Sequence, residues 1–115
     1  MNWIPLTDDN QLETINKQSF LPGSKGVLVF KHSSRCSISS VALSRLERAF
    51  DVPATELPAY FLDILSNRNL SDKIAEVYGI PHQSPQLLII KNGKCVYTAS
   101  HFEISFADIQ AAISS

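Results

Sequence analysis

Residues 84–99 read SPQLLIIKNGKCVYTA, and this stretch decides the fold. The apolar run at 87–90 predicts a buried strand, and residues 94–99 predict a second strand. Between them stands Asn92-Gly93, a pair favoured in two-residue hairpins because both central residues of a type I′ turn need positive φ. We therefore expect the two strands to pair antiparallel.

Strand and helix patterns alternate in the rest of the chain. The stretches 26–30 and 60–64 are short and apolar, which is typical of buried strands. Helical spacing of apolar residues covers 39–50, and a second helix opens at Asn69 and is closed by Gly79. The remaining expected elements are a helix between Thr7 and Pro22, a helix over 105–113 capped by Ser105, and a short edge strand over 3–6.

The order of these elements predicts the fold class. Strands separated by helices favour parallel pairing, whereas the hairpin adds an antiparallel pair. We therefore predict an α/β protein with a thioredoxin-like fold, in which a mixed central β-sheet carries helices on both faces. We find no internal repeat, linker or low-complexity tract, so residues 1–115 are expected to form a single domain.

The composition narrows the classes of function. Of the 115 residues, 44% are hydrophobic and 18% are charged, which is typical of a globular protein. The net charge is -1 without a basic stripe or polybasic run, so we expect no nucleic-acid partner and no membrane partner. The N-terminus lacks a signal-peptide pattern, and the apolar run at 87–90 is too short to cross a bilayer. We expect a cytoplasmic protein.

Cys36 is the candidate nucleophile. The strand at 26–30 leads into the loop that carries Cys36, which is then expected at the N-terminus of the following helix. A helix N-terminus has a partial positive charge and unpaired N–H groups, and Arg35 adds a full charge. Both features stabilise a thiolate, the reactive form of cysteine. The alternative is a cysteine that only packs in the helix cap.

Ser39 stands three residues after Cys36, where dithiol oxidoreductases carry a second cysteine. A hydroxyl cannot resolve a mixed disulfide, so an external thiol must release Cys36. We expect Ser39 to cap the helix, with a hydrogen bond to the thiolate as the alternative. Cys95 is the other possible resolving thiol, but it starts a strand at the far end of the sheet. At about 3.3 Å per residue it lies roughly 16 Å from the active edge, whereas disulfides need Cα atoms within about 7 Å.

The three histidines of the chain are all expected at the edge of the sheet that carries Cys36. His32 and His101 are the candidates to tune the Cys36 thiol or to protonate a leaving thiolate, while His82 lies in the loop before residue 85. The alternative for each histidine is a hydrogen bond within its loop. A Cys/His metal site is a further alternative, but no ligand motif is found, so we expect no metal. Pro85 is expected to be cis and to face Cys36, as in thioredoxin-like folds.

Several motifs together resemble one family. The stretches 1–6, 30–39, 84–86 and 99–101, which read MNWIPL, FKHSSRCSIS, SPQ and ASH, resemble the monothiol bacilliredoxins of the YtxJ type. The resemblance implies a thioredoxin-like fold and bacillithiol redox chemistry. Cys36 would remove bacillithiol from bacillithiolated client proteins, and a low-molecular-weight thiol or its reductase would regenerate the protein. Bacillithiol would be a co-substrate, with no bound cofactor.

Ser84 and Pro85 would form the substrate-binding segment, because the proline exposes the Ser84 backbone to a substrate strand. The family often has proline after the cysteine, where this chain has Ser37. In addition, no acidic residue lies in 26–30, so the buried aspartate of thioredoxins is absent and proton transfer must use another group or solvent.

Two alternatives belong to other classes of protein. One is an iron–sulfur or metal carrier like the single-cysteine glutaredoxins, which typically have Gly-Phe-Ser after the cysteine and a Gly-Cys-Asp-like turn. This chain instead has Ser-Ile-Ser at 37–39 and Ser-His-Phe at 100–102, which counts against a cluster. The other alternative is a thioredoxin-fold binding module without turnover.

Overall fold

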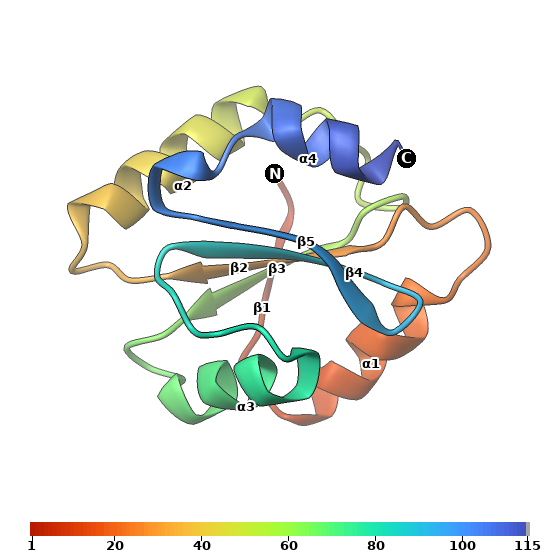
Figure 1. Cartoon of the computed structure of the whole chain (residues 1–115), viewed down its shortest axis with the longest axis horizontal. Helices are drawn as coiled ribbons and strands as arrows, with labels where there is room; N and C mark the ends of the chain where they lie inside the picture. The colour runs from red at the N-terminus through yellow and green to blue at the C-terminus, as the bar shows by residue number, and fades with distance from the viewer. Residues whose placement is uncertain (115) are drawn as a thin grey trace.

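Five strands form one mixed sheet in the order β1-β3-β2-β4-β5 (Figure 1). The computed structural model describes residues 1–114. The strands are β1 (Trp3–Pro5), β2 (Val27–His32), β3 (Ala59–Asp63), β4 (Gln86–Lys91) and β5 (Lys94–Ser100). The helices are α1 (Asn10–Ser19), α2 (Ser37–Ala49), α3 (Arg68–Tyr78), α4 (Phe106–Ile113) and a 3-10 turn, η1 (His101–Glu103).

The pairing of the strands confirms the predicted mixed sheet. β3 runs parallel to both β1 and β2, whereas β4 runs antiparallel to β2 and β5. Asn92 and Gly93 join β4 to β5 with φ values of 52° and 76°, the positive values that a type I′ turn requires. The Asn-Gly pair therefore forms the hairpin that the sequence predicted.

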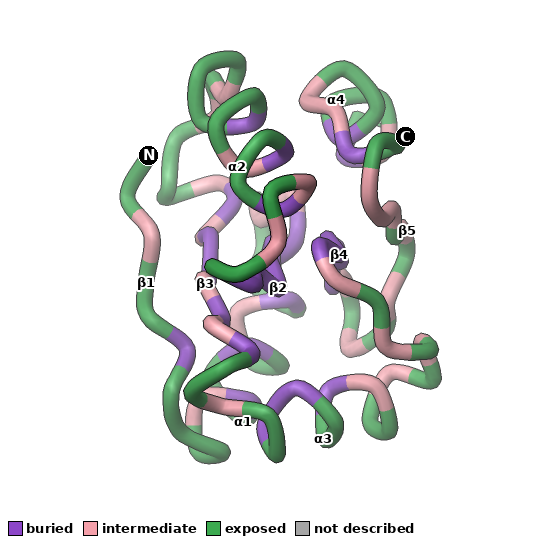
Figure 2. Tube along the Cα trace, turned by 90° about the vertical axis from the view of Figure 1, so that its left-hand side faces the viewer, coloured by how far each residue is buried: buried purple, intermediate pink, exposed green. Residues whose placement is uncertain are grey.

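Helices cover both faces of the sheet. Figure 1 shows α2 and α4 on one face and α1 and α3 on the other. Side chains alternate along β2, so that Leu28 and Phe30 pack in the core with α2 and α4, while Val27 and Val29 pack in the core with α1 and α3. Figure 2 shows the buried positions concentrated on β2, β3 and β4 and on the helix sides that face them. The same alternation directs the side chains of the last two residues of β2 to opposite faces of the sheet.

Helix α2 begins two residues earlier than the sequence predicted. Cys36 is its N-cap with extended backbone angles (φ -108°, ψ 116°), and the Ser40 N–H donates to the Cys36 carbonyl at 3.2 Å as the first helical bond. Helix α1 begins later than expected, at Asn10. The preceding N–H groups of Thr7 and Asp8 donate to the Gln11 side chain instead.

A glycine marks the entry to β2. Gly26 has φ +121°, and a Cβ added there would lie 2.9 Å from the Ile90 carbonyl oxygen of the neighbouring strand. Gly23, three residues earlier, has φ +80° but open space around it. The close approach of β2 and β4 therefore requires glycine at position 26 for space as well as for backbone angle.

Candidate thiol site

Cys36 lies at the positive end of α2 and is partly exposed. A tight turn brings it there directly from β2, and its N–H donates to the Ser33 carbonyl at 3.1 Å. The first turn of α2 has no acidic residue to offset the helix dipole, and Arg35 beside it is exposed. This placement puts the sulfur beside the backbone N–H groups at the start of α2, which carry a partial positive charge, and leaves it accessible to a second sulfur atom.

Three segments leave the sheet at the edge that carries Cys36. In the strand register Lys31 is paired with Gln86, and Gln86 is paired with Ser100. The loop that follows β2, the loop that precedes β4 and the turn that follows β5 therefore start from neighbouring positions. Among the candidates from the sequence, this edge brings Cys36, Pro85 and His101 into one region.

The Ser84–Pro85 peptide bond is cis, which confirms the sequence prediction. Pro85 is buried, and its carbonyl accepts a hydrogen bond from the His101 N–H at 3.1 Å. His101 itself has a positive φ of 54°. The backbone of His101 thus ties the end of β5 to the segment that carries the proline.

Ser39 does not cap the helix, so that part of the sequence prediction was wrong. It is the third residue of α2 and is fully buried, with its side chain turned toward the end of β2. Its Oγ accepts the Ser33 N–H at 3.1 Å and lies 2.7 Å from His32 Nδ1. Since one lone pair of Oγ is occupied by Ser33, the hydroxyl proton is free to point at the imidazole.

His32 is the last residue of β2 and is only 8% exposed. Its ring lies 5.3 Å from that of Phe61. Burial lowers the pKa of His32 below its ordinary value, while the carboxylates of Asp63 and Glu47 act in the opposite direction. Burial therefore favours the uncharged imidazole at neutral pH.

His82 faces the other side of the sheet from His32. Its Nδ1 lies 3.1 Å from Ser71 Oγ on α3 and 3.4 Å from Lys31 Nζ on β2. The histidines therefore lie at the same end of the strands, as expected, but His32 and His82 lie on opposite faces of the sheet. Sequence reasoning missed Lys31, which is fully buried. The only signal was a lysine directly after an apolar strand.

Cys95 lies at the opposite end of the sheet, as expected. It is paired with Ile90 near the hairpin, and its Sγ donates to the Tyr97 carbonyl at 3.3 Å. Burial raises the pKa of the Cys95 thiol, which favours the protonated and less reactive form. Both cysteines are free thiols. Cys95 therefore has the surroundings of a structural residue.

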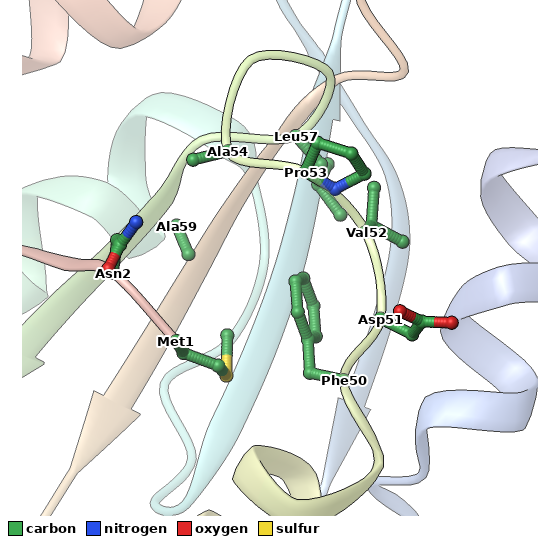
Figure 3. Close-up of a pocket in the computed structure, with 9 residues that line it drawn as sticks. All are labelled: Met1, Asn2, Phe50, Asp51, Val52, Pro53, Ala54, Leu57 and Ala59. Carbon is green, nitrogen blue, oxygen red and sulfur yellow. The ribbon is translucent and has the colours of Figure 1, made fainter.

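A pocket of about 370 Å³ lies away from this region, at the C-terminal end of α2 (Figure 3). Its lining includes Met1, Phe50 and Leu57 but neither a cysteine nor a histidine. Across residues 1–114, no three Cys, His, Asp or Glu side chains come together as metal ligands. Within the same residues no helix is long and apolar enough to cross a membrane.

The fold and the single cysteine at a helix N-terminus define a class: thioredoxin-fold proteins with a monothiol site. The chain matches the model of one family, the monothiol bacilliredoxin BrxC, over residues 4–109. The chain belongs to this family, which supports a function in redox chemistry.

Solved structures agree with the thioredoxin fold. One similar structure is a candidate oxidoreductase with a thioredoxin fold, at 30% identity and a TM-score of 0.77, covering 95% of this chain and 91% of that chain. Thioredoxin from Malassezia sympodialis (Mala s 13) matches at 18% identity and a TM-score of 0.71, with 98% and 89% coverage. Thioredoxin from Trypanosoma brucei brucei matches at 11% identity and a TM-score of 0.73, with 98% and 88% coverage. The two thioredoxins support the fold alone.

Proposed function

We propose that this protein removes bacillithiol from client proteins by thiol–disulfide exchange at Cys36. The Cys36 thiolate attacks the bacillithiol sulfur of the mixed disulfide, so that a new S–S bond forms and the old one breaks. The client leaves as a thiolate and takes a proton from solvent. One observation carries the proposal: Cys36 lies at the positive end of α2, with a buried serine in the resolving position and the other thiol at the far end of the sheet.

Regeneration then requires an outside thiol. Since Ser39 cannot attack a disulfide, a low-molecular-weight thiol attacks the Cys36–bacillithiol bond and leaves with the bacillithiol, or a reductase does so. Bacillithiol is a co-substrate in this scheme, and the partners are bacillithiolated clients and that thiol or its reductase. The cytoplasm, where small thiols keep cysteines reduced, is the compartment that suits this cycle.

The other candidate residues have supporting roles in the proposal. Arg35 stabilises the thiolate by its charge, and His32 with Ser39 fixes the turn that carries Cys36. The backbone hydrogen bond from His101 to Pro85 holds His101 at the end of the sheet that carries Cys36. Ser84 and Pro85 bind the backbone of the client segment next to its modified cysteine.

Intact mass spectrometry tests the proposal directly. A peptide with one bacillithiolated cysteine is incubated with the reduced protein, and transfer is expected to add the mass of one bacillithiol to the protein and restore the free peptide. Cys36→Ser should abolish the transfer, and Cys95→Ala should retain it. Removal of bacillithiol by Cys36→Ser would refute the mechanism, and loss of transfer in Cys95→Ala would assign Cys95 a role in the exchange.

A further inference from the structure

A charged side chain is buried on the face of the sheet opposite Cys36. Lys31, the residue before His32 on β2, has no exposed surface. Its Nζ donates to the Ser71 carbonyl of α3 at 3.0 Å and lies 3.4 Å from His82 Nδ1. Burying an ammonium group is costly unless hydrogen bonds replace the lost water. An apolar residue would fill this position at lower cost, so the ammonium group requires an explanation.

The contacts of Lys31 fix the state of the His82 ring. An ammonium group only donates, so Nδ1 is the acceptor in the contact with Lys31, whereas the Ser71 hydroxyl, 3.1 Å from the same nitrogen, fits either role. The imidazole is therefore neutral, with its proton on Nε2. Protonation of Nδ1 would remove the acceptor of the Lys31 contact and place a second positive charge beside the Lys31 ammonium.

The charges around the pair are consistent with this state. Burial lowers the pKa of Lys31 to about 8, with Asp72 opposing the shift and Arg68 adding to it. Burial also lowers the pKa of His82, and the charges of Lys31 and Arg68 lower it further against the effect of Asp72. At neutral pH the ammonium and the neutral imidazole therefore coexist.

His82 belongs to the loop that connects α3 to the cis proline. Gly79 ends α3 with φ +67°, and the Gln86 side chain donates to the Pro81 carbonyl at 2.9 Å. The prolines at 81 and 85 have no N–H, which reduces the hydrogen bonds that the loop backbone can make. Side-chain contacts from β2, β4 and α3 therefore stabilise the position of this loop.

The outer side of the same loop borders a groove. Ile80, Pro81 and Gln83 form one wall of a groove of about 240 Å³, and Thr98, Ala99 and Ser100 of β5 form the other. The loop thus has an inner side fixed by Lys31 and an outer side open to a ligand. A shift of His82 would move both the groove wall and the Ser84–Pro85 segment.

We propose that Lys31 and His82 are positioning residues, which hold the 80–85 loop so that Ser84 and Pro85 present their backbone to a disulfide-bearing client segment. The proposal rests on the proposed function. Lys31 and His82 act on recognition of the client peptide and not on the thiol, because they contact α3 on one face of the sheet while Cys36 begins α2 on the other.

Lys31→Met tests the proposal, with Lys91→Met as its matched control. Lys91 also lies on a strand and donates to a backbone carbonyl, that of Ser24 at 3.3 Å, but at the other end of the sheet. With a bacillithiolated nonapeptide as substrate, Lys31→Met should raise KM about tenfold with little change in kcat. Lys91→Met should leave KM unchanged. The rate of Cys36 alkylation by iodoacetamide should be the same in all three proteins.

A second pair of variants separates the acceptor atom from simple packing. His82→Asn keeps an acceptor close to the position of Nδ1, whereas His82→Leu removes it. His82→Asn should therefore stay within about threefold of the wild-type KM, and His82→Leu should match Lys31→Met. Amide hydrogen exchange at residues 82–84 should be faster in Lys31→Met and His82→Leu than in the other proteins. This pair also decides the question if Lys31→Met does not fold.

The outcomes that would overturn the proposal are specific. An unchanged KM in Lys31→Met and His82→Leu would overturn it, and so would slower alkylation of Cys36, which would place the effect at the thiol. An equal rise in KM for a small bacillithiol disulfide without a peptide would overturn it as well. If the wild-type protein fails to accept any bacillithiolated substrate, the proposed function fails instead. Amide exchange then still decides whether Lys31 and His82 hold the loop.

Discussion

At the scale of single residues, Ser39 shows how this site differs from a dithiol site. Its hydroxyl joins the Ser33 N–H to the His32 imidazole inside the protein. A thiol at this position would be a weaker partner for both groups, because sulfur is a weak donor and a weak acceptor. The serine at the position of a resolving thiol therefore has a structural task of its own.

Removal of the Ser39 hydroxyl should destabilise the fold. Ser39→Ala leaves two buried polar groups without this partner, so we expect a loss of about 1–3 kcal/mol in the free energy of unfolding. Urea denaturation measures the loss. Ser40→Ala, at the exposed next position of α2, is the matched control and should change stability by less than about 0.5 kcal/mol. Equal effects of the two substitutions would contradict the role given to the Ser39 hydroxyl.

The two cysteines should differ strongly in reactivity. Cys36 is partly exposed at a helix N-terminus, whereas burial raises the pKa of Cys95. At neutral pH we expect iodoacetamide to alkylate Cys36 at least about tenfold faster than Cys95. Peptide mapping over time measures both rates, and in urea they should converge. Similar rates in the folded protein would count against an activated thiol at position 36.

Some site residues were predictable from the sequence and some were not. The placement of Cys36 at the start of α2 and the cis bond at Pro85 were predictable because each has a local signal, a cysteine before a helical pattern and a proline before a strand. Ser39 was assigned to the wrong task, because its partners His32 and Ser33 reach it only after the chain turns back. Lys31 was missed because its burial depends on hydrogen-bond partners in α3 and in the 80–85 loop, which are far from it in the sequence.

At the scale of elements, β2 determines the layout of the site. Its last two residues point to opposite faces, where Lys31 contacts α3 and the loop after it and His32 contacts the start of α2. The hairpin between β4 and β5 was predictable because a two-residue turn depends on local backbone preference. The start of α2 was misplaced by two residues. Its N-cap, Cys36, makes no side-chain capping hydrogen bond, so the sequence carries no capping signal there.

The entry to β2 should be sensitive to a single methyl group. Gly26→Ala places a Cβ 2.9 Å from the Ile90 carbonyl oxygen and also strains the backbone. Gly23→Ala, with positive φ but open space, should cost only the backbone strain of about 1 kcal/mol. We expect Gly26→Ala to cost at least about twice as much, because β2 must move away from β4. Chemical denaturation measures both values, and a smaller cost at position 26 would contradict the close approach.

At the scale of the whole molecule, the sheet keeps two titrating side chains neutral on opposite faces. His32 lies under α2 and His82 lies against α3, and burial lowers the pKa of both. The topology that separates them was predictable from the order of strands and helices. Their environments were not, because each depends on contacts between elements far apart in the chain.

The stability of the protein should therefore fall in mild acid. A histidine in the unfolded chain has a pKa of about 6.5, and the folded values are lower, so below about pH 6.5 the unfolded state binds more protons. The free energy of unfolding contributed by His32 and His82 is complete above that pH and decreases as the pH falls toward their folded pKa values. Urea unfolding at a series of pH values measures the slope. His82→Asn should reduce it, while Gln83→Asn in the same loop should not.

The place of Trp3 at the edge of the sheet has a practical consequence. Its indole N–H donates to Glu47 of α2 at 2.9 Å, and its ring lies 5.6 Å from Phe61, which in turn contacts His32. It is the one tryptophan of the chain, so all tryptophan fluorescence comes from this position. We expect its emission to respond to changes at Glu47 of α2 and, through Phe61, to changes at His32. Stopped-flow fluorescence with a bacillithiolated peptide should therefore show whether a reaction at Cys36 changes these surroundings, without a dye and without altering either thiol.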